Sequence, residues 1–521
     1  MLYRKLRILA VILLASAAAA PLPSQTRARK KTTTSAARRK AAAKKQASGK
    51  KSRKATAKKP AVPAVSSTAP RTVASLMSDM TSMAGRIRSG KFGIMAISLT
   101  RGDTLFSENA GTPLMPASTM KMLTSAVAFE RLGPSYQFST DVLRDGALGP
   151  DGTLSGNLYL RGDGDPSLSG RYMPGGPGAP MNYLADQLAS RGVKRVTGDV
   201  IGDASAFDDQ RIPEGWLTRY LQAGYAARVS GLSLNENLVW VTVTPDGAKL
   251  EPATSAIPLV SNVKTVSGRS ASLSVRRRSD GTILVSGRIG SNSPPRRYEY
   301  VVEDPATFTT GALKAALVAK GIAVDGNIRL GTTPFSAVKI AGVQSPTLDR
   351  IISAMNRESI NHFAELLMRN AARGPRHDKQ GNVANSQALL RNFFATRIGA
   401  DTIALEVHDG SGLSTLDRVT PREMVQMLAY AHKSSWGPWF HASLPVAGES
   451  ELLKRRMRGG AAQGNLHAKT GTTNDVIGLG GYVTALNGEV IAFSFIYNGK
   501  DRWTAKAMID VMGATLANFA R

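Results

Sequence analysis

Residues 118–132 read STMKMLTSAVAFERL, and this stretch decides the fold around it. Its apolar residues recur at helical spacing, so we expect a helix that begins at Ser118 and runs through Leu132. Lys121 then lies one turn above Ser118 on the same face, within reach of the serine hydroxyl. The free N–H groups at the start of a helix favour negative charge near the serine oxygen. The stretch therefore predicts a serine nucleophile, Ser118, with Lys121 as its base.

Two further short clusters follow in a fixed order. Ser359-Ile360-Asn361 supplies a hydroxyl and an amide, and Lys469-Thr470-Gly471 supplies a second cation. Lys121 accepts a proton only as a neutral amine, and both burial and the nearby charge of Lys469 favour that form. Together the three clusters provide the groups that acylate a serine without a histidine.

Each cluster alone is a weak signal, because Ser-x-x-Lys and Ser-x-Asn also occur at turns and helix caps. The competing copies are Ser48-Gly49-Lys50-Lys51, Ser155-Gly156-Asn157, Ser233-Leu234-Asn235 and Ser336-Ala337-Val338-Lys339. Context separates them, because a long apolar run follows Ser118 and an amphipathic stretch follows Asn361. A hairpin signal follows Gly471, in which Asn487-Gly488 between alternating apolar runs predicts a two-residue turn.

With these clusters the chain resembles the class C low-molecular-mass penicillin-binding proteins, D-alanyl-D-alanine carboxypeptidases and endopeptidases that act on peptidoglycan. The stretches 158–168, 202–208 and 409–414 are also similar to that family, and the likeness covers roughly residues 75–521. Many serine penicillin-recognising enzymes carry Ser-Asp-Asn in the middle cluster, where this chain has Ile360. That position is not thought to do chemistry.

The resemblance implies an acyl-enzyme mechanism on stem peptides, with β-lactam antibiotics as covalent inhibitors. Ser118 attacks the carbonyl of the penultimate D-alanine, Lys121 takes its proton, and backbone N–H groups of Ser118 and Thr472 form the oxyanion hole. Ser359 and Asn361 relay the proton to the leaving amine and hold the peptide. The terminal carboxylate is received by Lys469, Thr470 and Thr472, beside Gly471. Whether the enzyme acts as a carboxypeptidase or an endopeptidase stays open.

Asp203 and Phe207 are candidates for contacts with the polar end of the stem peptide's diamino acid. They fall in and beside the family-like stretch 202–208, within a long segment between the nucleophile and the second cluster. The alternative for both residues is a role in a turn or in the core.

Two other classes of function use parts of the same pattern. A β-lactamase would share the three clusters, but the large insertion favours a polymeric substrate over a small drug. A non-catalytic wall-binding scaffold would not require Ser118, Lys121 and Lys469 to be intact. No metal site or cofactor is expected, because the six histidines are scattered and the chain has no cysteine.

The first twenty residues predict export. Residues 1–7 are basic and residues 8–20 are apolar and end in small side chains, as in a secretory signal, although an uncleaved anchor is the alternative. Export would place the protein in the periplasm or at the exterior of the cell envelope.

A basic arm is predicted over residues 21–72. Fifteen Lys or Arg and no Asp or Glu lie between Arg27 and Lys59, which accounts for about half of the net charge of +29. Such a composition favours disorder. The arm is either a solvated linker or an attachment to anionic envelope polymers, and nucleic acid is not an expected partner after export.

The remaining chain predicts an α/β (α+β) catalytic domain of the transpeptidase/β-lactamase type, interrupted by smaller β-rich domains. Residues 73–143 and 345–521 are expected to form the catalytic domain. The segment between them, 144–344, contains short alternating runs typical of strands. The family resemblance implies the same layout.

Overall fold

The protein is described here from a computed structural model, which covers residues 65–377 and 379–521. The predicted signal sequence and the residues between Arg27 and Lys59 lie outside the described residues. In the part of the chain that is described, no helix is both long and apolar enough to cross a membrane.

One antiparallel sheet joins the two ends of the described chain, with its strands in the order β18-β19-β20-β1-β2. Its members are β1 (Lys91–Ser98), β2 (Thr104–Glu108), β18 (His467–Thr472), β19 (Val476–Thr484) and β20 (Val490–Asn498). β1 pairs with β20 along its whole length. The chain therefore leaves this sheet after β2 and returns to it at β18.

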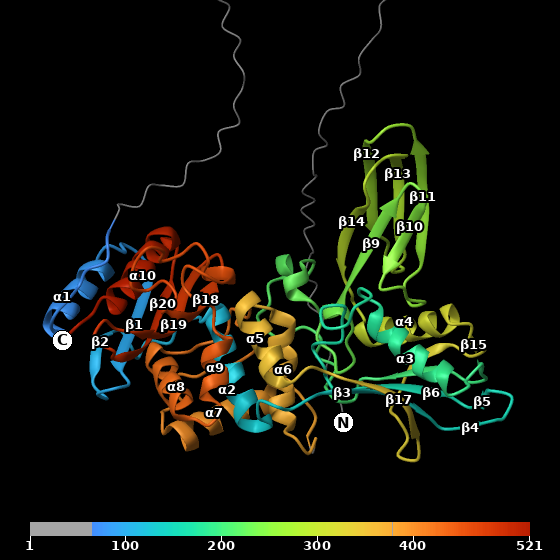
Figure 1. Cartoon of the computed structure of the whole chain (residues 1–521), viewed down its shortest axis with the longest axis horizontal. Coiled ribbons are helices and arrows are strands. Elements are labelled where there is room, and N and C mark those ends of the chain that lie inside the picture. Colours follow the sequence, from blue (N-terminus) through green and yellow to red (C-terminus); the bar gives the residue numbers. More distant parts are fainter. Residues whose placement is uncertain (1–64, 378) are drawn as a thin grey trace, which may run out of the picture. The chain divides into compact units, whose positions relative to one another are not determined.

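Helices cover both faces of this sheet (Figure 1). Because successive side chains of a strand point to opposite faces, Met95 packs with one apolar core and its neighbours Ile94 and Ala96 with another. The core around Ile94 includes α1 (Val73–Ala84) and α10 (Arg502–Ala517). The core around Met95 is built by α2 (Met120–Leu132), α5 (Leu348–Glu358), α6 (Asn361–Arg373), α7 (Val383–Phe393), α8 (Pro421–Lys433) and α9 (Gly437–Ser443).

The start of α8 shows how the sequence sets a helix boundary. The hydroxyl of Thr420 accepts the Glu423 N–H, and the Glu423 carboxylate accepts the Thr420 N–H, which completes a capping box. Pro421 occupies the first helical position, where its missing N–H costs nothing. This helix contacts β1 and β20 and thereby joins the sheet to the helical layer.

The hairpin of β19 and β20 is confirmed, but its predicted two-residue turn is wrong. The strand pairing ends at Thr484 and Val490, and the Gly488 N–H donates to the Ala485 carbonyl. Gly488 has a φ of 81°, whereas Asn487 does not have a positive φ. A two-residue turn of the predicted kind needs positive φ at both residues, so the connection is a longer turn with one left-handed glycine.

The segment between α2 and α5 contains four more sheets and two α-helices, α3 (Ala179–Ser190) and α4 (Pro305–Ala319). A mixed five-stranded sheet runs in the order β16-β8-β6-β3-β17. Its strands are β3 (Ser139–Arg144), β6 (Leu158–Gly162), β8 (Val200–Asp203), β16 (Ile328–Leu330) and β17 (Val338–Gln344).

The other three sheets are smaller, with orders β15-β7-β5-β4, β10-β9-β14 and β11-β13-β12. Their strands are β4 (Ala147–Leu148), β5 (Thr153–Ser155), β7 (Arg195–Val196), β9 (Leu238–Thr244), β10 (Gly247–Glu251), β11 (Leu259–Val266), β12 (Ala271–Arg277), β13 (Ile283–Gly290), β14 (Arg296–Val301) and β15 (Ala323–Val324). α3 and α4 share one apolar core with strands of these sheets. We call residues 139–344 the inserted region, because β3 pairs with β6 and β17 from Ser139 onward.

Candidate active site

Ser118 lies in a short 3-10 turn, Ala117–Thr119, that leads directly into α2. The helix predicted at Ser118 is confirmed, but its first turn is a 3-10 turn and the α-helix begins at Met120. Gly471 of β18 packs closely against this turn. A side-chain carbon on Gly471 would stand only 2.7 Å from the Pro116 carbonyl oxygen, so any larger residue would push the strand away from the serine.

The Lys121 amine is fully buried and contacts three oxygen atoms. Its Nζ lies 2.6 Å from Asn361 Oδ1, 2.8 Å from the Ser411 carbonyl oxygen and 3.1 Å from Ser118 Oγ. A neutral amine has two N–H groups and one lone pair. When it donates to the amide and carbonyl oxygens, the lone pair is left for the serine hydroxyl.

Burial sets the protonation of the lysines. It lowers the pKa of Lys121 to about 8, although the carboxyl groups of Asp409 and Glu365 act in the opposite direction. Burial first, and the charge of Lys121 second, hold the pKa of Lys469 well below its ordinary value. Each amine therefore loses its proton at a pH far below that of an exposed lysine, which a general base near neutral pH requires.

The stretch 409–414, which was noted in the sequence only for its likeness to the family, provides an acceptor for the Lys121 amine. The buried Asp409 carboxylate accepts three backbone N–H groups of its own loop and the indole N–H of Trp216. These bonds fix the loop, and the loop presents the Ser411 carbonyl to Lys121. Because the acceptor is a backbone carbonyl, this contact could not be predicted from the residue types in the sequence.

Ser359 and Asn361 lie at the junction of α5 and α6. Ser359 ends α5 in the left-handed region, with φ 62° and ψ 43°, and Asn361 is the first residue of α6. Such a conformation costs a non-glycine residue on the order of 1–3 kcal/mol, so it persists only where its surroundings hold it. Lys469 Nζ lies 2.9 Å from Ser359 Oγ. The three clusters, far apart in the sequence, thus meet around one group of hydrogen bonds.

Arg171 of the inserted region contacts residues on both sides of this junction. Its Nη1 lies 2.8 Å from both carboxylate oxygens of Glu358, the residue before Ser359. Its guanidinium carbon also lies 5.9 Å from the ring centre of Phe363, in the first turn of α6. Glu236, also in the inserted region, accepts the remaining N–H groups of the guanidinium. Arg171 therefore ties the inserted region to the loop that carries Ser359.

A pocket of about 410 Å³ opens onto these groups. Four of the predicted site residues line it, namely Ser118, Ser359, Asn361 and Thr472. Lys121 and Lys469 lie behind its wall with no exposed surface, and Thr470 and Gly471 are also buried.

The sequence did not single out three further residues of the lining, Tyr220, Tyr225 and Arg502. The two tyrosine rings form an edge-to-face pair with their centres 5.8 Å apart. The Tyr225 carbonyl accepts the Asn361 Nδ2–H at 2.8 Å, which turns Oδ1 of that amide toward Lys121. The sequence signal for this pair was two aromatic residues five positions apart in a loop. The Tyr225 carbonyl is a backbone group, so its contact with Asn361 could not be predicted from residue types.

Asp203 and Phe207, which were expected to contact the substrate, are buried and have partners within the chain. The Asp203 carboxylate accepts the backbone N–H groups of Ser205 at 3.0 Å and Thr333 at 2.7 Å. The Phe207 ring packs with Val229 and Leu366 in a small apolar cluster. The turn and core roles that the sequence left as the alternative describe the contacts of both side chains, and a contact of either with substrate stays a prediction.

Replacing Asp203 by alanine is expected to destabilise the inserted region by about 2 kcal/mol, because the backbone N–H groups of Ser205 and Thr333, both partly buried, lose their acceptor. Burial opposes ionisation, yet the hydrogen bonds hold the pKa of Asp203 below its ordinary value. The stabilisation is therefore present above pH 4 and shrinks as the pH falls through the lowered pKa. Thermal unfolding at pH 7 and at pH 3 measures both effects.

The matched control is Asp186→Ala, which removes an exposed ion pair with Lys320 and should leave the melting temperature nearly unchanged. An unchanged melting temperature in Asp203→Ala, together with slower cleavage of stem peptides, would support the original assignment.

The competing Ser-x-x-Lys copy at Ser336 lies on the surface. Both Ser336 and Lys339 are exposed, and the lysine forms an ion pair with Asp141 at 2.7 Å. In the Ser-x-Asn copy that ends at Asn235, the amide donates to the Leu238 carbonyl within a turn. Neither copy combines a buried amine with a serine, so geometry selects Ser118.

Comparisons with known proteins agree with this geometry. Residues 73–519 match the family model described as the D-Ala-D-Ala carboxypeptidase 3 (S13) family. A D-alanyl-D-alanine carboxypeptidase of Actinomadura sp. is 33% identical over 454 residues, covering 82% of this chain and 81% of the relative. The D-alanyl-D-alanine carboxypeptidase DacB of Haemophilus influenzae is 26% identical over 424 residues, covering 78% and 85%.

The fold is that of a solved penicillin-binding protein. The crystal structure of penicillin binding protein 4 (dacB) from Haemophilus influenzae superposes with a TM-score of 0.70 and 23% identity, covering 84% of this chain and 98% of that one. With the serine and lysine geometry described above, the family match gives the identity: the chain belongs to the D-Ala-D-Ala carboxypeptidase 3 (S13) family and is a serine-type carboxypeptidase.

Proposed function

We propose that the enzyme hydrolyses D-Ala-D-Ala stem peptides of peptidoglycan through an acyl-enzyme on Ser118. The observation that carries the proposal is the buried Lys121 amine, which lies 3.1 Å from Ser118 Oγ and has two other oxygen acceptors. A surface lysine beside a serine would be protonated and could not act as a base.

Acylation begins when Ser118 Oγ attacks the carbonyl carbon of the penultimate D-alanine. The serine proton moves to the lone pair of Lys121, and the oxyanion is stabilised by the N–H groups of Ser118 and Thr472. The C–N bond then breaks as the proton held by Lys121 passes to the leaving amine, which returns Lys121 to its neutral form. Ser359 Oγ faces the pocket and lies 2.9 Å from Lys469 Nζ, so it is the residue we assign to this transfer.

The carboxylate of the leaving residue binds beside Thr472 and Arg502, which line the pocket. Lys469 lies behind Ser359 with no exposed surface, so it acts through the Ser359 hydroxyl, 2.9 Å from its amine. Water then attacks the ester carbonyl, the proton of that water passes to Lys121, and Ser118 leaves and regains a proton from the lysine.

Mass spectrometry after incubation with benzylpenicillin tests this assignment, because a penicilloyl adduct should appear on the peptide that contains Ser118. Release of D-alanine from a monomeric pentapeptide measures carboxypeptidase activity. Cleavage of a cross-linked dimer measures endopeptidase activity. Rapid turnover of the penicilloyl-enzyme would instead indicate a β-lactamase.

We also propose that the enzyme acts outside the cytoplasm and that its basic arm attaches it to anionic envelope polymers. The proposal rests on the composition of residues 1–72, since multiple Lys and Arg bind any polyanion. Deleting residues 27–59 is expected to leave turnover of a short peptide unchanged and to weaken sedimentation with purified envelope material at low salt. The difference should shrink as salt rises. Sedimentation that the deletion leaves unchanged at every salt concentration would reduce the arm to a spacer.

A further inference from the structure

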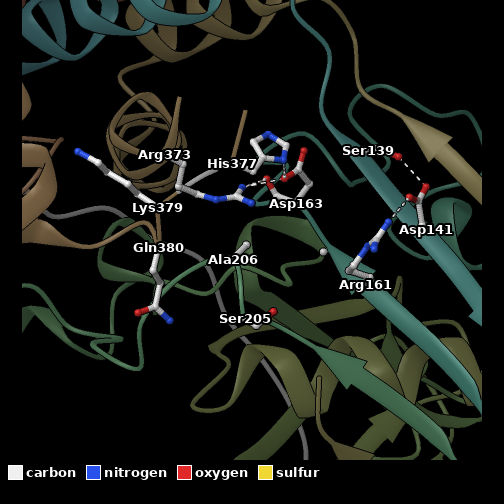
Figure 2. Close-up of a pocket in the computed structure, with 11 residues that line it drawn as sticks. Ser139, Asp141, Arg161, Asp163, Ser205, Ala206, Arg373, His377, Lys379 and Gln380 are labelled. Atoms are coloured by element: carbon white, nitrogen blue, oxygen red, sulfur yellow. Dashed lines mark hydrogen bonds and ion pairs between the residues drawn. The ribbon is translucent and has the colours of Figure 1, made fainter. Parts of the chain in front are cut away.

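A second cavity, of about 570 Å³, lies where the inserted region meets the end of α6 (Figure 2). Its walls come from β3, β6, the loop after β8 and the residues that follow α6. The family-like stretch 202–208 contributes Ser205 and Ala206 to this lining, whereas Asp203 and Phe207 point into the interior. The mechanism above uses none of these residues.

The lining carries more positive than negative charge. Arg161, Arg373 and Lys379 are its cations, and Asp141 and Asp163 are its anions, with His377 between them. Arg161 donates only through Nη2 to Asp141, at 3.2 Å, and 48% of its side chain is exposed. Lys379 is exposed and forms no ion pair within residues 65–377 and 379–521. An anionic ligand would therefore meet cations that are not fully neutralised.

Arg373 is the most buried of the three cations of the cavity. The residue is 7% exposed, and its Nη1 donates to Asp163 at 2.7 Å. Its Nε is buried and has no hydrogen-bond partner among the described residues. Nε lies below the accessible surface, so an anion in the cavity would approach this guanidinium through its outer nitrogens.

The cavity and the catalytic pocket are joined by α6. Asn361 is the first residue of this helix and lines the catalytic pocket, and Arg373 is its last residue and lines the second cavity. Twelve helical steps separate them by about 18 Å. An extended peptide of about five residues covers that distance. A single chain end cleaved at Ser118 does not need so distant a contact, but a cross-linked substrate has a second stem peptide that can reach it.

We propose that this cavity binds a carboxylate of the second stem peptide in a cross-linked peptidoglycan dimer, with Arg161, Arg373 and Lys379 as its donors. The inference deepens the proposed function and rests on it. The cavity contains no Trp, Tyr or Phe on which a sugar ring could stack, which favours a carboxylate over the glycan. Paired charge-assisted hydrogen bonds from arginine suit that group.

The test compares the double variant Arg161→Gln/Lys379→Gln with the double variant Arg195→Gln/Lys264→Gln. The control also removes two exposed cations of the chain, one of them paired with Asp325, but neither lines the cavity. Binding of a purified cross-linked dimer is measured by titration calorimetry in the Ser118→Ala background, where no turnover is expected. The same dimer with the terminal carboxylate of its second peptide amidated is the matched ligand.

We expect the cavity variant to bind the unmodified dimer about tenfold more weakly and the control variant to bind it as before. Amidation should weaken binding to the parent protein by a similar factor and have little further effect in the cavity variant. Equal affinities in both variants, or equal losses with both ligands, would overturn the proposal. Benzylpenicillin labelling of the wild-type enzyme is scored separately, so a failure of the proposed function is distinguishable from a failure of this site.

Discussion

Ser118→Ala is expected to abolish benzylpenicillin labelling and to lower D-alanine release by at least about a thousandfold, because it removes the only atom that forms the acyl bond. The fold should survive. Ser118 lies in a turn whose geometry depends on the backbone contacts of its neighbours, including the close approach of Gly471. Labelling is measured by mass spectrometry of the intact protein, and folding by thermal unfolding.

The control for this variant is Ser336→Ala, which removes an exposed hydroxyl with the same Ser-x-x-Lys spacing. We expect this change to leave both activities intact. Labelling that persists in Ser118→Ala, or that disappears in Ser336→Ala, would show that the wrong serine has been assigned.

Lys121→Met is expected to slow acylation by benzylpenicillin about a thousandfold, since a positioned general base contributes on the order of 10²–10⁴. In the proposed mechanism the base is the neutral amine, and burial lowers the pKa of Lys121 to about 8. The acylation rate should therefore rise with pH up to about 8 and level off above it. The second-order rate constant, measured from pH 6 to pH 9, checks this profile.

Stability provides a separate readout of the same group. Below a pH of about 8 the buried Lys121 stays charged, and between about 8 and the ordinary lysine pKa the folded protein releases a proton that the unfolded chain keeps. The wild-type protein should therefore gain stability relative to Lys121→Met as the pH rises from about 8 toward the ordinary lysine range. A pH-independent acylation rate, with unchanged stability differences, would remove Lys121 from the role of base.

The proximity of Ser118 and Lys121 could be predicted from the sequence because it is local. Ser118 lies in the turn that leads into α2 and Lys121 lies in α2, so helical spacing brings them together. The hairpin after Gly471 was also recoverable from alternation, although its turn was not. Asn487-Gly488 suits several turn types, and the end of the strand pairing at Thr484 and Val490 decides which one forms.

The parts that could not be predicted depend on distant backbone groups. The carbonyl of Ser411 accepts a hydrogen bond from the Lys121 amine, and the carbonyl of Tyr225 orients the Asn361 amide. Backbone acceptors leave no trace in residue type. One partner of Asp203 could not be predicted for a related reason, because its carboxylate accepts the N–H of Thr333, 130 positions away.

Arg171 and the Tyr225 carbonyl each join the inserted region to the loop that carries Ser359. These two contacts determine whether the protein can be shortened. A chain trimmed to its two catalytic segments would keep Ser118, Lys121 and Lys469 but would lose the two contacts that Arg171 and Tyr225 make with the Ser359 loop. The left-handed Ser359 and the orientation of the Asn361 amide would then have no support from the inserted region. The inserted region thus cannot be removed without loss of contacts at the active site. A smaller relative with the same three clusters must stabilise that loop with residues of its catalytic domain alone.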